Sequence, residues 1–248
     1  MSDALDQYVY SWLGDRQHTV IEHGDTSTRD ALPWWSTQLS KNNMADIRLT
    51  MDPTGQGSSY ISRGDLFEFA AREKTFDDQS ATLSFLWHVV LWGSGAKHSR
   101  IAPKINSFAD IAQRRHHVSL LQQAARVAKA GDIGAAYTLL RPNSRAAIRN
   151  LGPSYFTKFL YFATGGETAL ILDQKVATNL QVLKCPTAPS NSSSSSSTEY
   201  VTYCQTLRSW ADLITANGTP CQADELERAL FAGVPRGPKA TKTVHPSS

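Results

Sequence analysis

Two residues near the middle of the chain have the types and the spacing for amine chemistry. Lys158 stands within the apolar run Phe156–Phe162, and Asp173 follows fifteen residues later, just before the helix-forming stretch 174–180. A lysine is nucleophilic only when it is unprotonated, and an apolar surrounding lowers its pKa by desolvation. A carboxylate at a helix N-terminus is stabilised as an anion. One helix and a turn cover this separation, so the sequence predicts an amine and a carboxylate side by side.

Each residue also has a simpler structural interpretation. A lone lysine on an apolar helix can extend its ammonium group into water, and an aspartate before a helix is a common N-cap. Lys175, in the first turn after Asp173, is a rival amine that we interpret as an exposed helix residue. The order of Lys158 and Asp173, with apolar helical segments around them, favours catalysis over two unrelated roles.

The composition is that of an ordinary globular protein. The chain has 248 residues, 25 basic and 22 acidic side chains, and a net charge of +3, which permits a nucleic-acid partner without requiring one. We expect neither a secretory signal nor a membrane partner, and therefore a cytoplasmic protein. Cys185, Cys204 and Cys221 lack the paired spacing of a zinc site or a disulfide framework. We expect no metal and no cofactor.

The elements that must position the pair are helices. Apolar periodicity and capping signals predict helices at 3–15, 62–72, 78–92, 107–129, 132–140, 144–150, 156–162, 174–180, 200–214 and 223–231. Only residues 47–51 and 169–172 have the character of short strands, so the predicted fold class is all-α. The helix at 78–92 is apolar on nearly every side and belongs in the middle of a bundle. Trp34 and Trp35 are interpreted as core residues.

The chain is predicted to form one helical domain over residues 1–235. Its proline- and serine-rich segment at about 186–198 includes the six consecutive serines 192–197. Such a segment buries too little apolar surface to offset its ordering entropy, so we expect a disordered surface loop. The polar tail 236–248 is expected to be disordered as well.

Residues 151–180 resemble the catalytic block of the helix-hairpin-helix DNA glycosylases, in particular the 8-oxoguanine DNA glycosylase branch. That family has a hairpin, a catalytic lysine in an apolar helix, a connector, and a catalytic aspartate followed two places later by a basic residue. Lys158, Asp173 and Lys175 occupy these three positions. The resemblance implies a two-lobed helical bundle that binds double-stranded DNA containing a modified base. We expect it to act as a monomer.

The hairpin departs from the family pattern, which has glycines before the catalytic lysine. Here the segment is Gly152–Thr157, and Ser154 and Phe156 replace those glycines. Glycine there accommodates positive φ and lets backbone amides approach a phosphate. The chain is therefore identified as a divergent, short member of the branch, with Ser154 and Tyr155 assigned to the DNA-binding surface.

The resemblance also implies a DNA-binding loop after the first buried helix and a pocket for the extruded base. The loop is small and basic, and its candidate DNA contacts are Ser94, Gly95, Lys97, His98 and Arg100, with Gly93 allowing a close backbone approach. The simpler interpretation is a helix C-cap followed by solvated charges. Candidates for the base pocket are Gln174, Lys175, Phe231 and Trp210, with Tyr161 and Phe162 as further aromatic candidates. The basic run 114–117 fits either a phosphate-facing patch or a solvated helix face.

The implied activity is that of a DNA glycosylase, which flips a damaged or modified base out of the duplex and cleaves its N-glycosidic bond. The base is that of 8-oxoguanine-type repair or a modified base of phage DNA, with or without a strand-nicking lyase step. Two other classes of protein fit the same sequence. One is a non-catalytic helical DNA-binding module, and the other is a helical protein-interaction domain in which Lys158 extends into water.

Overall fold

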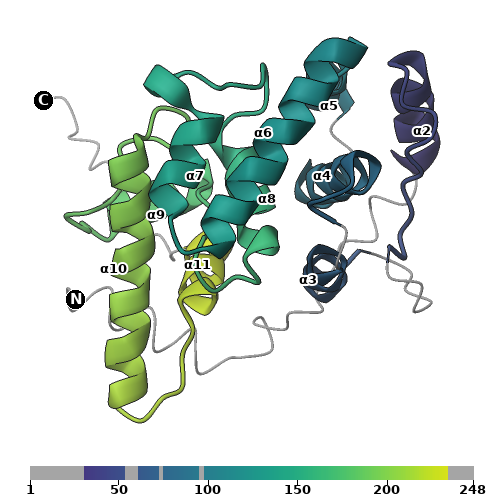
Figure 1. Ribbon diagram of the computed structural model, residues 1–248. Helices are drawn as coiled ribbons and strands as arrows, with labels where there is room; N and C mark the ends of the chain where they lie inside the picture. Colours follow the sequence, from purple (N-terminus) through teal and green to yellow (C-terminus); the bar gives the residue numbers. More distant parts are fainter. Residues whose placement is uncertain (1–30, 54–60, 73–74, 95–97, 234–248) are drawn as a thin grey trace, which may run out of the picture.

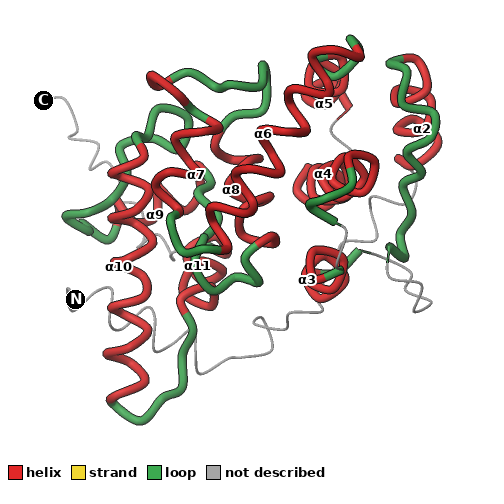
Figure 2. Tube along the Cα trace, in the orientation of Figure 1, coloured by secondary structure: helices red, strands yellow, loops and turns green. Residues whose placement is uncertain are grey.

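The computed structural model describes residues 31–53, 61–72, 75–94 and 98–233, and all regular structure in these ranges is helical (Figures 1 and 2). The prediction of an all-α fold is thereby confirmed. The helices are α2 (Leu32–Lys41), α3 (Arg63–Ala71), α4 (Gln79–Ser94), α5 (His98–Asn106), α6 (Ile111–Lys129), α7 (Ile133–Leu140), the 3-10 turn η3 (Pro142–Ser144), α8 (Pro153–Ala163), α9 (Gln174–Val182), α10 (Ser197–Ala216) and α11 (Ala223–Ala232).

Helix α8 lies at the centre of this arrangement. It packs against α3 and α4 on one side and against α6 on another, while α2 packs on α5. Helices α7, α9, α10 and α11 form a second group, in which α10 contacts both α7 and α11. Figure 1 shows the early helices α2 to α5 together at one side of the molecule and α7 and α9 to α11 at the other. In this view α8 lies between the two groups.

The core continues through α4, as its apolar sequence predicts. Nearly every residue from Leu83 to Leu91 is buried, including Trp87 at 0% exposure. Trp35 is also fully buried, and its ring lies 6.2 Å from that of Trp87. Trp34 is partly buried and packs on the same core. The interpretation of the two adjacent tryptophans as core residues is confirmed.

One predicted helix, at 144–150, is wrong. The chain makes only the 3-10 turn η3 there, and Asn143, Ser144 and Asn150 have φ values of 50°, 61° and 65°. Positive φ at three non-glycine residues is incompatible with a continuous α-helix. Instead, the segment is tied to the end of α5 because Asn150 Nδ2 donates to the Pro103 carbonyl at 3.0 Å.

A helix is also present where a basic loop was expected. Residues 98–106 form α5, and the next helix begins at Ile111 instead of near residue 107. Asp110 defines this start because its side chain accepts the Gln113 N–H at 2.7 Å. The residues between α5 and α6 therefore form a turn, where the sequence predicted the first turn of the helix at 107–129.

The strand candidates do not pair with other strands in the described ranges. Residues 169–172 form a buried, non-helical connector between α8 and α9. Side chains satisfy its backbone groups: Tyr200 and Tyr203 donate to the carbonyls of Leu170 and Ile171 at 2.9 and 2.8 Å. Two tyrosines of α10 therefore replace the neighbouring strand that this apolar run would otherwise need.

The serine tract is not the disordered loop that its composition predicts. Ser192 and Ser195 are buried, and the Ser192 hydroxyl and amide both donate to Gln174 Oε1, at 3.2 and 3.3 Å. Ser196 and Glu199 form a capping box that starts α10. The hydroxyl groups supply hydrogen bonds in place of apolar burial, so the tract is a fixed connection between α9 and α10.

Two other expectations, the helix at 3–15 and the disordered tail at 236–248, lie outside the described residues. Within the described ranges, no helix has the length and apolar character needed to cross a membrane.

Candidate active site

Helix α8 holds Lys158 inside the protein. Gly152 is its N-cap in an extended conformation, and Pro153 occupies the first turn. Backbone N–H groups in this turn have no partner within the helix, so proline loses no hydrogen bond there. Because other helices surround α8, Lys158 is only 6% exposed. Its Nζ donates to the Ser154 carbonyl at 2.8 Å. The ammonium group therefore does not extend into bulk water, which was the simpler interpretation of this lysine.

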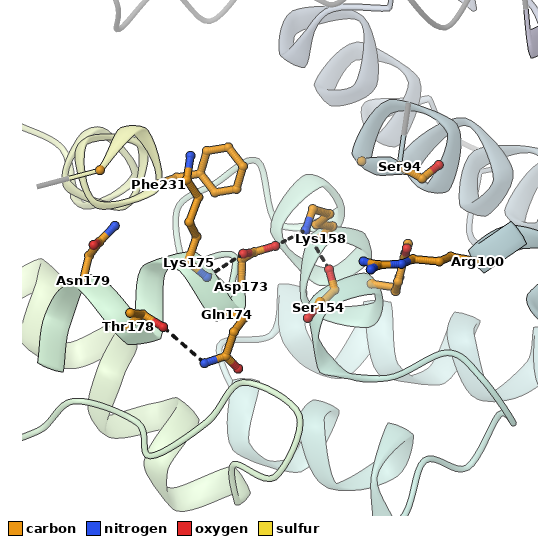
Figure 3. A pocket seen from close by; sticks show the side chains of 13 residues that line it. Ser94, Arg100, Ser154, Lys158, Asp173, Gln174, Lys175, Thr178, Asn179 and Phe231 are labelled. Carbon is orange, nitrogen blue, oxygen red and sulfur yellow. Dashed lines mark hydrogen bonds and ion pairs between the residues drawn. The ribbon is translucent and has the colours of Figure 1, made fainter. Parts of the chain in front are cut away.

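Asp173 serves both as an N-cap and as the partner of Lys158. Its Oδ1 accepts the Lys175 N–H at 2.8 Å, which caps α9. Its Oδ2 lies 3.4 Å from Lys158 Nζ, and 24% of its side chain is exposed against 8% for the lysine. In Figure 3 the two side chains point toward each other from α8 and from the start of α9. The amine and the carboxylate are adjacent, as their spacing predicts.

The connector between the two helices fixes this distance. The Thr157 hydroxyl accepts the Leu172 N–H at 3.0 Å and donates to the Pro153 carbonyl at 2.7 Å. This side chain ties the residue before Asp173 to the turn of α8 that precedes Lys158. The pair is therefore held by a hydrogen bond across the loop as well as by the capping of α9.

Lys158 and Asp173 lie at the wall of an open cavity of about 800 Å³. Ten of the residues assigned from the sequence line it: Gly93, Ser94, Arg100, Ser154, Tyr155, Lys158, Asp173, Gln174, Lys175 and Phe231. These residues come from α4, α5, α8, α9 and α11, so the cavity opens where the two groups of helices meet. The size is in the range of small-molecule sites.

Phe231 is the exposed aromatic face of this cavity. Its side chain comes from α11 and the residue is 42% exposed, which is unusual for a large apolar residue in this chain. Lys175 Nζ lies 4.6 Å from the centroid of its ring. Lys175 is exposed and points to Phe231, away from the buried position that Lys158 occupies (Figure 3). An accessible ring beside the pair is a stacking surface for a planar ligand.

Several assigned residues are not brought to the cavity or cannot be described. Trp210, a candidate for the base pocket, is partly buried on α10 and is not among the residues that line the cavity. Gly95 and Lys97 lie outside the described residues, as does the side chain of His98, whose backbone begins α5. Tyr161 and Phe162 are fully buried core residues. Both side chains are enclosed by the core, so neither ring is accessible for stacking with a base.

Three features of the site differ from the sequence interpretation. Thr178 and Asn179 line the cavity from the second turn of α9, one turn beyond the capping aspartate. Their spacing from Gln174 and Lys175 was a readable signal, because residues four positions apart share a helix face. Gly93 also lines the cavity, and its backbone lies against the side chain of Lys158. We had assigned this glycine to close contact with DNA.

The third feature is a set of buried charged groups that faces the same lysine. Burial lowers the pKa of Lys158, while the nearby carboxylates of Asp173 and Glu227 act in the opposite direction. Glu227, on α11, is 1% exposed. No local motif indicated this residue, because an acidic run at the start of a helix usually faces solvent. The amine is thus desolvated, which favours the unprotonated, nucleophilic form.

The rim of the cavity carries cations and hydrogen-bond donors. Arg100 lines it from α5, and Lys104, one turn later, places its Nζ 4.2 Å from the centroid of the Tyr155 ring. Tyr155 and Ser154 belong to the segment that replaces the glycine hairpin. Among the described residues, no three His, Cys, Asp or Glu side chains converge in a way that would hold a metal ion.

Comparison with known proteins identifies the family. Residues 21–231 match the family described as "Putative 8-oxoguanine DNA glycosylase OGG-like protein". Searches among curated proteins and among solved structures found no match. The match extends over most of the 248 residues and includes every helix that lines the cavity except the last residue of α11. The chain therefore belongs to the OGG-like family of 8-oxoguanine DNA glycosylase proteins.

Proposed function

We propose that this protein is a DNA glycosylase in which Lys158 is the nucleophile and Asp173 stabilises the charge that develops on the sugar. The observation that carries the proposal is the buried amine 3.4 Å from a partly exposed carboxylate at the wall of an open cavity. A buried lysine is rare unless it is paired, and this one faces a space that a ligand can enter. The family match supports the same class of activity.

The reaction requires an extruded nucleotide. The target base leaves the stack and enters the cavity, where the exposed ring of Phe231 offers one stacking face. The Lys158 amine attacks C1′ as the bond between C1′ and the base nitrogen breaks, and the base leaves with its bonding electrons and takes up a proton. The carboxylate of Asp173 stabilises positive charge on the sugar during this step. The product is a covalent amine adduct at C1′.

A lyase step follows from this adduct. The C1′–O4′ bond of the adduct breaks and O4′ takes up a proton, which opens the sugar ring and gives a Schiff base. Loss of a proton from C2′ of this Schiff base then eliminates the 3′ phosphate, so the strand is nicked. An enzyme that used only an activated water would release the base without this adduct. The buried position of the amine, which favours its neutral form, is what supports the covalent route.

DNA binding is assigned to the cavity rim. Arg100 and the donors of Ser154 and Tyr155 take the place of the backbone contact that glycines make in the usual hairpin. The pocket residues are Gln174, Lys175 and Phe231, with Thr178 and Asn179 added from the structure. The substrate we propose first is 8-oxoguanine, with other oxidised purines and the modified bases of phage DNA as the next candidates. The protein acts as a monomer on duplex DNA.

The test is release of free base from a panel of duplexes carrying these candidate bases. Wild-type protein should release at least one of them, and Lys158→Gln should not release it. If no duplex in the panel loses a base although the protein binds it, the chain is a DNA-binding module without the chemistry. If the protein binds no DNA at all, the interaction-domain interpretation replaces both.

A further inference from the structure

A cluster of charged side chains is buried beside the catalytic lysine, where side chains of α3, α8 and α11 meet. Arg63 Nη1 donates to the Tyr161 hydroxyl at 2.8 Å, and Arg63 Nη2 lies 3.6 Å from Glu227 Oε2. The Tyr161 hydroxyl donates to Asp224 Oδ2 at 3.0 Å, and Arg228 Nη2 lies 3.5 Å from the same oxygen. The proposed chemistry assigns no task to this cluster.

Glu227 is the least satisfied carboxylate in the cluster. Its side chain is 1% exposed, and its Oε2 accepts no hydrogen bond within the described part of the chain. Asp224 Oδ1 also has no hydrogen-bond partner in the described part of the chain, but Asp224 Oδ2 accepts the Tyr161 hydroxyl, and Asp173 accepts the Lys175 N–H. Burial raises the pKa of Glu227 to about 7, against the opposing effect of Arg63 and Lys158. An additional proton is therefore accommodated best on Glu227.

The charges of the cluster and the catalytic pair cancel when all groups are ionised. The cations are Arg63, Lys158 and Arg228, and the carboxylates are Asp173, Asp224 and Glu227. Attack on C1′ needs Lys158 as a neutral amine. If its proton left for bulk water, an uncompensated negative charge would stay in the protein interior, which is costly. If the proton stayed on Glu227, the sum of charges would not change.

On the basis of the proposed function, we propose that Glu227 accepts the proton that Lys158 loses before it attacks C1′. The ammonium becomes an amine, the carboxylate becomes a carboxylic acid, and no further reactant is needed. Glu227 touches no substrate atom, so it is a positioning residue that sets the protonation state of the nucleophile. The proposal concerns where the proton resides at equilibrium, so it requires no direct hydrogen bond between the two side chains.

The groups around Glu227 are less suited than Glu227 to accept the proton of Lys158. The charged or titratable groups around it are Arg63 of α3, Lys158 and Tyr161 of α8, Asp173 at the N-cap of α9, Tyr203 of α10, and Asp224 and Arg228 of α11. The arginines remain charged. Burial raises the pKa of both tyrosines, so they remain neutral. Asp173 and Asp224 already hold hydrogen-bond donors.

The pH dependence of adduct formation tests the proposal. The rate of borohydride-trapped adduct is measured from about pH 5 to 9, a range that spans the ordinary and the raised carboxyl pKa. In wild-type protein, the logarithm of the rate should rise, become flat between two ionisations, and rise again. In the flat range Lys158 and Glu227 together hold one titrating proton. The amine is then made neutral by transfer of this proton to Glu227 instead of by its loss to water.

In Glu227→Gln the flat range should disappear. The rate should rise in a single step, and its midpoint should lie below the upper ionisation of wild-type protein because an anion near the ammonium has been removed. Glu167→Gln, which changes an exposed carboxylate in the connector after α8, should keep the wild-type profile. A flat range that persists in Glu227→Gln, or is absent from wild-type protein, overturns the proposal. A structural role alone would lower the rate without changing the number of ionisations.

A second measurement needs no substitution at Glu227 and no DNA. Infrared spectra of the full chain, recorded over the same pH range, should contain the carbonyl band of a protonated, buried carboxylic acid. In Lys158→Gln this band should persist to higher pH, because the neighbouring cation has been removed. A band with the same pH dependence in both proteins overturns the proposal. An absent adduct on every duplex would instead overturn the proposed function, so the two failures are distinguishable.

Discussion

The backbone of Gly93 lies directly against the side chain of Lys158. A Cβ atom built at Gly93 would stand 2.8 Å from Lys158 Cδ and 3.1 Å from Lys158 Cε. The absence of a side chain near the end of α4 therefore makes room for the Lys158 side chain to reach Asp173. We therefore expect Gly93 to influence the position of Lys158, the proposed nucleophile.

Gly93→Ala should lower activity without lowering stability. The new methyl group displaces the lysine side chain, and a displacement of about 1 Å costs roughly a hundred-fold in rate. Alanine is a better helix former than glycine by about 0.5–1 kcal/mol, so thermal unfolding should not occur earlier. Gly134→Ala in α7 is the matched control, because the new Cβ would lie 3.2 Å from Cγ2 of Val201 in α10, away from the cavity. Equal rates for Gly93→Ala and wild-type protein would show that the lysine does not need this space.

Asp173→Asn should separate the two roles of the aspartate. Asparagine is as good an N-cap as aspartate, so α9 and the free energy of unfolding should change little. The carboxylate is lost, and base release should fall by roughly a hundred- to a thousand-fold. Asp173→Ala should lose about 1 kcal/mol of stability in addition. Denaturant unfolding and base release together measure both effects; a fully active Asp173→Asn would exclude the charge-stabilising role.

Phe231→Ala should weaken capture of the extruded base. Stacking of a base on an aromatic ring is worth about 1–3 kcal/mol, so kcat/KM should fall by roughly five- to a hundred-fold. The ring is 42% exposed, and its removal should leave stability nearly unchanged. Leu213→Ala, which removes a side chain of α10 that is 54% exposed, is the control. An unchanged kcat/KM in Phe231→Ala would mean that the base enters elsewhere.

His88 should make the protein sensitive to acid. Burial lowers the pKa of its ring to about 4, and the ring accepts the Thr50 N–H at 3.2 Å. The unfolded chain binds a proton near pH 6.5 that the folded protein excludes, so stability is lost as the pH falls from about 6.5 to 4. The slope from this group approaches about 1.4 kcal/mol per pH unit.

The variant His88→Gln tests this pH dependence, because the unfolding free energies of wild-type protein and variant can be compared at each pH. The unfolding free energy of wild-type protein minus that of the variant should fall as the pH drops through this window. Glu227 contributes with the opposite sign, because its raised pKa stabilises the folded state at low pH, but it is present in both proteins and cancels. A difference that does not vary with pH would show that His88 titrates normally.

The proximity of Lys158 and Asp173 was predictable because each residue is positioned by local signals. Gly152 and Pro153 mark the start of α8, Asp173 is an N-cap, and the connector is too short to separate them widely. The prediction of a disordered loop at the serine tract was wrong for a different reason. Composition argued for disorder, yet Ser196 and Glu199 carry the capping-box pattern, and Ser192 finds partners on Gln174 that only the folded chain supplies.

The buried cluster could not be predicted, because it depends on contacts between distant residues. Arg63 and Glu227 are joined only by the packing of α3 and α11 around α8, and in the sequence each looks like an exposed helix charge. Trp210 shows the opposite case. It shares an apolar stripe with residues of the core, but no residue of α10 is among those that line the cavity. The periodicity of apolar residues shows which face of a helix is buried, but it does not show which element packs against that face.

The most direct test of the account is the identity of the residue that becomes attached to DNA. Wild-type protein, Lys158→Gln and the control Lys175→Gln are treated with borohydride on the duplex that loses its base, and the adduct is located by peptide mass spectrometry. The account predicts an adduct on Lys158 in wild-type protein and in Lys175→Gln, and none in Lys158→Gln. An adduct that persists in Lys158→Gln, or that maps to Lys175, would contradict it.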